Sequence, residues 1–252
     1  MEEKTRINPE LLYSEISALL NRLHDQEHDH IHQAAEIAAK TIANDGVVHV
    51  FGSGHSYGFG LEMKDRPGAL APVHNISSAD LVIYGSTTVE EYRAPDNHFE
   101  RRSGIADELF DLYHVDKKDS FIVISNSGIN GLVIDMAAKA KQNGLPVVVV
   151  TSMEHTLAEA SRHPSGKKLY EFGDVVIDNC GPRGDALLET GRVEKVCSVS
   201  SITGAMIAHG ITVDAIEILE DMGIEPPVWM NADSKEHIAR NLELKAKYQG
   251  RV

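Results

Sequence analysis

The chain has 252 residues, 42% of them apolar, and a formal net charge of −14 at pH 7. This acidic excess repels nucleic acid and acidic membrane surfaces, so neither is expected as a partner. The two cysteines, Cys180 and Cys197, fit neither a metal knuckle nor a disulfide scaffold. A charged N-terminus and the lack of a run of ~20 apolar residues favour a soluble, cytoplasmic protein.

Helical periodicity, breaker residues and apolar runs divide the chain into alternating elements. A long helix is predicted over 9–44, and it ends before Gly46. Residues 70–98 are ambiguous, with one strand near 81–84. The other predicted strands are 47–51, 121–124, 147–151 and 174–178, and the other predicted helices are 57–65, 100–113, 132–142, 202–219 and 234–247.

Strands that alternate with helices indicate βαβ units, hence an α/β fold with a doubly wound parallel sheet covered on both faces. We expect one domain, with an N-terminal helical segment (1–45), an α/β core (46–222) and a C-terminal helical tail (223–252). In such sheets a ligand binds beyond the carboxyl ends of the strands, where the strand order reverses. Candidate site residues are therefore sought just after each strand.

Two predicted strands run directly into turns of small residues that precede a helix. Val-His-Val-Phe-Gly-Ser-Gly-His-Ser occupies 48–56, and Phe-Ile-Val-Ile-Ser-Asn-Ser-Gly-Ile-Asn occupies 121–130. Backbone N–H groups and the positive end of a helix meet at such a turn and favour an anion. The alternative is an ordinary turn with a Ser or Asn cap. Neither turn is a Walker A loop or a dinucleotide fingerprint. The candidate anion-binding residues are Ser53, Gly54, His55 and Ser56 in the first turn, Ser125, Asn126, Ser127, Gly128 and Asn130 in the second, and Arg66 after the first turn.

Together, Gly-Ser-Gly-His-Ser and Ser-Asn-Ser-Gly-Ile-Asn resemble the loops of the sugar isomerase (SIS) domain family. The similarity runs from about residue 10 to the C-terminus and is greatest to a stand-alone SIS subfamily. It implies a flavodoxin-like, three-layer SIS domain with flanking N- and C-terminal helices, which binds a phosphosugar through the two loops. Asn130 replaces the usual Thr of the second loop. The further features that carry the resemblance are Glu62, Arg66, Glu100-Arg101-x-x-Gly104, Ser165-Gly166-Lys167 and Pro226-Pro227-Val228.

The resemblance also implies candidate catalytic residues. In SIS heptose-phosphate isomerases, a His and a Glu stand six and ten positions after the serine that ends the first loop. In this chain that serine is Ser56, and the two positions hold Glu62 and Arg66. Glu62 and Arg66 are spaced i and i+4, so a surface ion pair is the alternative. His209 resembles a histidine on the last apolar helix of those isomerases; taken alone, it reads as a core histidine. Glu100 starts a helix, where a glutamate also favours the helix dipole.

Four histidines lie within nine residues of the first helix. His24, His28 and His32 are spaced i, i+4 and i+8, and two imidazoles on one helix face could bind a transition metal. No cysteine or third ligand at a fixed offset accompanies them, and Asp25, Glu27 and Asp29 lie between them. A solvated helix face is therefore the interpretation here, and no metal is assigned.

The function expected from this sequence is isomerisation of a phosphorylated monosaccharide between its aldose and ketose forms. Glu62 is the expected base, and His209, His55 and Glu100 are the candidate acid or oxyanion partners. No organic cofactor is required, and a metal that bridges Glu62 and His209 stays an open alternative without a full ligand set. The alternatives are a non-catalytic phosphosugar sensor and an isomerase for another anionic sugar, such as a sulfonated one. The apolar helix at 202–219 and the family resemblance predict a homodimer or homotetramer.

Overall fold

The structure is a computed structural model that describes residues 7–94, 99–191 and 194–252. The helices are α1 (Pro9–Ala43), α2 (Tyr57–Met63), α3 (Asp80–Ile83), α4 (Val89–Arg93), α5 (Ala106–Asp111), α6 (Gly131–Gln142), α7 (Met153–Ala158), α8 (Ser200–Asp221) and α9 (Lys235–Lys247). Short 3-10 turns are η1 (Gly54–Ser56), η2 (Phe99–Arg101) and η3 (Leu169–Phe172). The strands are β1 (Val48–Gly52), β2 (Val73–Ile76), β3 (Ser120–Ile124), β4 (Val147–Thr151), β5 (Val175–Asp178), β6 (Ala186–Glu189) and β7 (Lys195–Ser198).

Strands β1 to β5 form one parallel sheet in the order β2-β1-β3-β4-β5. Every residue of β1, β3 and β4 is buried, which explains why these strands are apolar on both faces. The chain runs from β1 out to β2 and then returns across β1 to β3, so the strand order reverses between β1 and β3. The crevice for a ligand in such a sheet lies at this reversal.

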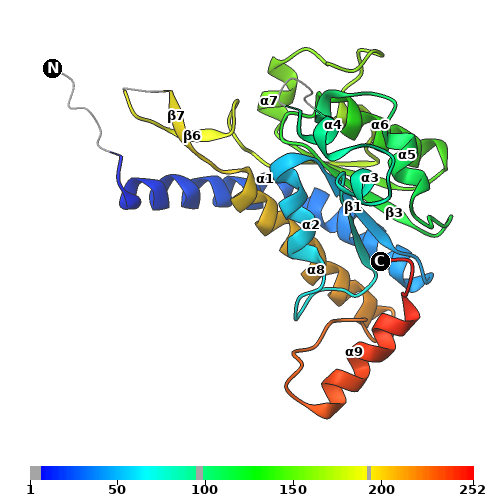
Figure 1. Cartoon of the computed structure of the whole chain (residues 1–252). Coiled ribbons are helices and arrows are strands. Elements are labelled where there is room, and N and C mark those ends of the chain that lie inside the picture. The colour runs from blue at the N-terminus through cyan, green and yellow to red at the C-terminus, as the bar shows by residue number, and fades with distance from the viewer. Residues whose placement is uncertain (1–6, 95–98, 192–193) are drawn as a thin grey trace.

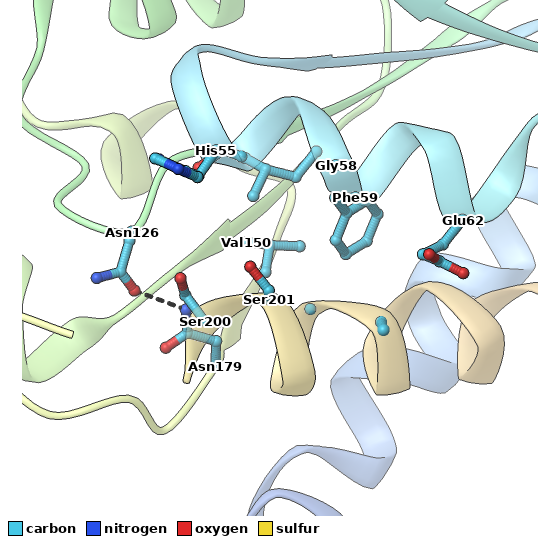
Figure 2. A pocket seen from close by; sticks show the side chains of 13 residues that line it. His55, Gly58, Phe59, Glu62, Asn126, Val150, Asn179, Ser200 and Ser201 are labelled. Carbon is cyan, nitrogen blue, oxygen red and sulfur yellow. Dashed lines mark hydrogen bonds between the residues drawn. The ribbon is translucent and has the colours of Figure 1, made fainter. Parts of the chain in front are cut away.

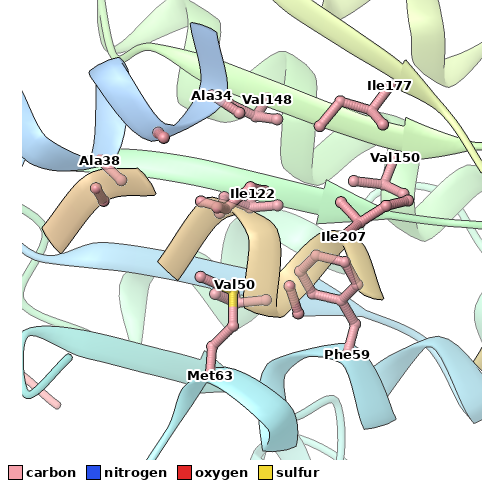
Figure 3. Close-up of a cluster of buried hydrophobic side chains, with 14 of the residues drawn as sticks. Ala34, Ala38, Val50, Phe59, Met63, Ile122, Val148, Val150, Ile177 and Ile207 are labelled. Carbon is pink, nitrogen blue, oxygen red and sulfur yellow. The ribbon is translucent and has the colours of Figure 1, made fainter. Parts of the chain in front are cut away.

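Helices cover both faces of the sheet and make three layers (Figure 1). One face packs against α1, α2 and α8, and its core contains side chains such as Ala38, Phe59, Ile122 and Ile207 (Figure 3). The other face packs mainly against α5 and α6. This arrangement confirms the predicted doubly wound α/β fold with N- and C-terminal helices beside the sheet.

Two elements in the middle of the chain differ from the prediction. The expected strand near 81–84 is wrong, because this stretch is the one-turn helix α3, in which Ile83 is exposed, followed by the exposed Tyr84. The edge strand is instead β2, whose four residues are all buried. A short β-branched apolar run cannot be assigned to strand or helix by periodicity alone. Here the fully buried segment 73–76 forms the edge strand, and the segment 80–83, in which only Leu81 is buried, forms a helix.

Two predicted helices are shorter than expected. The helix over 100–113 is divided into η2 and α5, because the chain turns at Gly104 with a φ of 87°. Helix α2 ends at Met63, since Lys64 is extended and Asp65 has a φ of 53°. Arg66 therefore lies beyond this helix and not on one face of it with Glu62. The hairpin of β6 and β7 and the short helix α7 have no counterpart in the predicted elements.

Helix α8 is, within the described residues, the one helix long and apolar enough to cross a membrane by length and composition. Of its most apolar window, 44% is buried inside the fold. Its buried side, which includes Ile207, Ile211 and Leu219, belongs to the core that also contains α1 and α2. These contacts identify α8 as a packing helix of the three-layer fold.

A buried polar network joins the amino ends of β1, β2 and β3. The His49 Nε2 atom lies 3.1 Å from an oxygen of Asp119, and its Nδ1 atom lies 3.1 Å from Nδ1 of His74. The Arg251 guanidinium donates to both oxygens of Asp119 at 2.6 and 2.8 Å. The C-terminal segment is thus fastened to the edge of the sheet opposite the carboxyl ends of the strands.

Candidate functional site

A pocket of about 140 Å³ opens at the carboxyl ends of β1, β3, β4 and β5 (Figure 2). It lies where the strand order reverses, the place expected for a ligand in this topology. The volume is below the ~300–1,000 Å³ of typical ligand pockets. Its polar lining comes from the turn after β1, helix α2, the turn after β3, the turn after β5 and the first residues of α8: His55, Ser56, Glu62, Asn126, Asn179, Ser200 and Ser201.

The first predicted loop places His55 and Ser56 in this pocket. Gly52 ends β1, and a Cβ atom at this position would lie 2.6 Å from the Ser56 carbonyl oxygen, so only glycine permits so tight a turn. The chain then forms η1 and continues directly into α2. Ser53 and Gly54 form the turn itself and do not line the pocket.

The second predicted loop contributes Asn126. The Asn126 Oδ1 atom accepts a hydrogen bond from the Asn179 amide at 2.9 Å. This contact fixes the side-chain orientation and leaves the Asn126 amide nitrogen available as a donor. Of the second turn, Asn126 is the residue that lines the pocket.

Other residues of the second turn are engaged within the loop or with its neighbours. The Ser125 hydroxyl accepts the Gly128 N–H at 3.1 Å, and the Asn130 Oδ1 atom accepts from Arg162 at 2.8 Å. Gly128 has a φ of 63°, and a Cβ atom there would lie 2.7 Å from the Thr156 hydroxyl. The structure therefore keeps Ser125, Ser127, Gly128 and Asn130 next to the pocket but outside its lining.

Glu62 and His209, which are 147 residues apart in the sequence, face each other across α2 and α8. The Glu62 Oε2 atom lies 3.3 Å from Nε2 of His209, and it also accepts from the Arg66 guanidinium. The His209 side chain is 54% exposed, so the interpretation of this residue as a core histidine is wrong. The predicted base Glu62 lines the pocket, and its predicted partner His209 contacts it from α8 without lining the pocket itself.

Glu100 lies elsewhere. It belongs to η2, which packs closely against the start of α6. The approach is so close that a Cβ atom at Gly131, the first residue of α6, would lie 2.8 Å from the Arg101 carbonyl oxygen. Glu100 is half-buried and does not line the pocket. Within this chain, the structure does not bring Glu100 to Glu62 and His209.

The sequence reasoning missed Asn179, Ser200 and Ser201. Asn179 follows β5 directly, so the rule that sites lie just after strands could have found it. Ser200 and Ser201 begin α8, and no sequence signal relates this helix end to the turns after β1 and β3. Asp185 fixes that end, because its carboxylate accepts the Ser200 N–H and hydroxyl, both at 2.8 Å.

The electrostatic character of the pocket is unusual for an anion site. Among the described residues that line it, none is lysine or arginine, and Glu62 is its carboxylate. The donors are neutral hydroxyl and amide groups together with His55. The cation in contact with Glu62 is Arg66, which lies outside the lining.

Comparison with known proteins gives a consistent family. A family model described as the SIS domain matches residues 12–152. A UPF0309 protein of Listeria monocytogenes serotype 4b (strain CLIP80459) is 35% identical over 235 residues, 93% of either chain. A UPF0309 protein of Caldanaerobacter subterraneus subsp. tengcongensis is 33% identical over 247 residues, 96% of this chain and 98% of the relative.

Solved structures agree on the fold. The phosphoheptose isomerase GmhA from Neisseria gonorrhoeae superposes with a TM-score of 0.52 at 18% identity, covering 82% of this chain and 96% of that one. A phosphoheptose isomerase from Francisella tularensis gives a TM-score of 0.51 at 16% identity, covering 82% of this chain and 95% of that one. At this level of identity the likeness extends to the arrangement of the helices and strands.

Proposed function

This chain belongs to the SIS domain family, and on that premise we propose that it binds a phosphorylated monosaccharide and interconverts its aldose and ketose forms. The observation that carries the proposal is the contact of His209 with Glu62, a carboxylate that lines a pocket whose other polar lining is His55 and neutral hydroxyl and amide groups. Proton transfer beside a carbonyl needs a base and a group that stabilises or moves a proton on the neighbouring oxygens. The pair supplies both.

Glu62 is the base in this proposal. Among the described residues, its contacts with Arg66 and His209 both end on Oε2, which leaves Oε1 for a substrate. The carboxylate takes the proton from the carbon beside the carbonyl and returns it to the adjacent carbon of the enediolate. In this proposal His209, which contacts Glu62, exchanges a proton with the enediolate oxygens. Because Arg66 contacts Oε2, it positions the carboxylate while the other oxygen reacts.

The anionic end of the sugar binds at the opposite end of the pocket. His55 and Ser56 offer donors from the turn after β1, and Asn126 offers its amide nitrogen from the turn after β3. Ser200 and Ser201 line the same space from the start of α8. An anchor at one end of a sugar aligns the reacting carbons at the other and lowers the entropy cost of the reaction.

A second copy of the chain completes the site in this proposal. Ile202, Met206, His209 and Val213 are spaced by four, three and four residues, as in the seam of a coiled coil. Met206 is 50% and Val213 is 65% exposed, although an apolar stripe of this spacing normally packs against another helix. Leu61, on α2 beside Glu62, is 51% exposed. A second copy that covers this stripe would shield Glu62 and His209 from water and enlarge the small pocket.

The experiment is a ligand-observed NMR screen of hexose, amino-sugar and heptose phosphates in heavy water. Line broadening of a sugar phosphate reports binding, and loss of its C2 proton signal reports abstraction and exchange. The proposal expects both from at least one compound. Binding without exchange supports the non-catalytic sensor, and no binding of any compound contradicts the proposal as a whole. Sulfonated sugars in the same screen test the other anion.

A further inference from the structure

Helix α1 carries a tract of four histidines, at positions 24, 28, 30 and 32, on a part of the helix that has no role in the site above. His24 and His28 are exposed, and both line a groove between α1 and α8. This groove also contains Asp214 and Glu217, and it borders the proposed interface, because Met206 and Val213 of the apolar stripe line it as well. The tract is thus an exposed cluster of imidazoles beside carboxylates, in a chain whose net charge of −14 attracts cations.

The His24 and His28 rings are placed for chelation. Residues spaced i and i+4 lie one turn apart on the same face of a helix, and the two ring centres are 6.0 Å apart. Metal–nitrogen bonds of about 2.1 Å in tetrahedral geometry require ring centres about 5 Å apart. The difference of about 1 Å is within reach of a side-chain rotation for two exposed rings.

In both His24 and His28, the Nδ1 atom contacts the carboxylate of the next residue. The Nδ1 atom of His24 lies 3.1 Å from Asp25 Oδ1, and the Nδ1 atom of His28 lies 3.3 Å from Asp29 Oδ1. A carboxylate on Nδ1 fixes the proton there and leaves the lone pair on Nε2. Metal-binding histidines are oriented in this way by their outer partners. The acidic residues that favoured a solvated face in the sequence are therefore the partners that a metal site requires.

His32 also has a carboxylate on Nδ1, but this carboxylate comes from the neighbouring helix α8 and not from the adjacent residue of α1. Its Nδ1 atom lies 2.7 Å from an oxygen of Asp214, which joins α1 to α8. The hydrogen bond to Asp214 and the charge of this carboxylate raise the pKa of His32 above its usual value. A histidine that holds its second proton more firmly is a weaker metal ligand. His32 therefore fastens the two helices, and the chelating pair is His24 and His28.

We propose that His24 and His28 bind one divalent transition-metal ion through their Nε2 atoms, at a surface site distinct from the Glu62–His209 pocket. Imidazole nitrogen suits Zn²⁺, Ni²⁺ and Cu²⁺, with Cu²⁺ bound most tightly of the three. Among the described residues no three ligating side chains already converge, so water fills the remaining positions. Asp214 and Glu217, in the same groove, add negative charge near the ion.

The test is a titration of the untagged full chain with Zn²⁺ against a chromophoric chelator, at pH 7.5. The wild type is expected to bind one Zn²⁺ per chain with higher affinity than any other site. His24→Ala and His28→Ala should each lower this affinity at least ~10-fold, because each removes one of the two ligands and even the loss of an outer partner of a ligand typically costs about that much. The matched control is His237→Ala, which removes a histidine that also faces a carboxylate, Asp233, but has no imidazole one turn away.

Two further measurements make the assignment falsifiable. His32→Ala should keep the wild-type affinity, whereas a loss equal to that of His24→Ala would assign the ion to a different pair and overturn the proposal. The electron paramagnetic resonance spectrum of the Cu²⁺ complex should show coupling to two nitrogens in the wild type and to one in His28→Ala. Unchanged Zn²⁺ affinity in both His24→Ala and His28→Ala would likewise refute the site. Circular dichroism verifies that each variant keeps its helix content.

Discussion

Acidification should destabilise this protein through the buried histidine pair at the amino ends of β1 and β2. His74 is 8% exposed, and its pKa is lowered to about 3 by burial, by the neighbouring His49 and by Lys64. Burial also lowers the pKa of His49, against the raising effect of its hydrogen bond to Asp119. With Asp119 as an acceptor, His49 carries its proton on Nε2, and its Nδ1 atom accepts from His74. A second proton on His49 would lie on Nδ1 and set two N–H groups against each other, whereas a second proton on His74 would place a charge on a buried ring.

The sign and size of the effect follow from the two states. The unfolded chain takes up a proton at His74 near pH 6.5, and the folded chain does so near pH 3. The stability from His74 is therefore complete above pH 6.5 and is lost as the pH falls toward 3. Between pH 7 and pH 5 the loss from this one group is about 2 kcal/mol, because each step of one in pH below 6.5 costs ~1.36 kcal/mol.

Urea unfolding at pH 7 and pH 5, followed by circular dichroism, measures this difference. The comparison variant is His74→Phe, which removes the titrating group and keeps a ring against Tyr113. We expect this variant to be less stable at pH 7, because the His49 Nδ1 atom loses its donor. Its stability should nevertheless fall by about 2 kcal/mol less than that of the wild type between the two pH values. An identical pH dependence in both proteins would refute this reasoning.

Three other predictions concern the turn, the interface and the anion site. Gly128→Ala should cost at least ~1–2 kcal/mol of unfolding free energy from its positive φ alone, and the clash with Thr156 adds to this cost. The control is Gly144→Ala, which has a φ of 75° and open space around the new Cβ atom. Equal losses of stability in the two variants would be contrary to expectation. Met206→Asp with Val213→Asp should convert an oligomer into a particle near 27.6 kDa by light scattering; a wild type that already has this mass at micromolar concentration rules out the proposed second copy. Asn126→Ala should weaken binding of a cognate sugar phosphate by about 1.5–3 kcal/mol, as for a hydrogen bond to a charged group. Ser127→Ala should weaken it less in a calorimetric titration, and the reverse order would move the anion from the pocket to the loop.

The sequence predicted the central strands and the long helices closely for a physical reason. Strand β4 has the predicted bounds, 147–151. A run that is apolar on both faces can bury all its side chains only in a sheet that is covered on both sides. The run at 81–84 has a similar composition but lies at the edge, where one turn of helix buries Leu81 and exposes Ile83. At such a position the tertiary environment, and not local propensity, selects the element.

The candidate site was predictable to the extent that it follows strand ends. His55, Ser56 and Asn126 come from the two turns found in the sequence, and Glu62 and His209 came from a resemblance. Ser200 was not predictable, because its place in the pocket depends on how α8 packs beside α2. The exposed position of His209 could not be read from its apolar neighbours either, since a stripe of that spacing fits a core as well as an interface.

The central claim, that Glu62 is the base of a sugar-phosphate isomerase, is tested most directly by C2-proton exchange in heavy water. Glu62→Gln keeps the size of the side chain and leaves the anion site untouched, so we expect sugar-phosphate binding within a few-fold of the wild type. Exchange should fall by at least ~10²-fold, the low end for a positioned general base, while the surface control Glu243→Gln exchanges at the wild-type rate. Wild-type exchange by Glu62→Gln, together with its loss in Glu100→Gln, would contradict the account and place the base on η2.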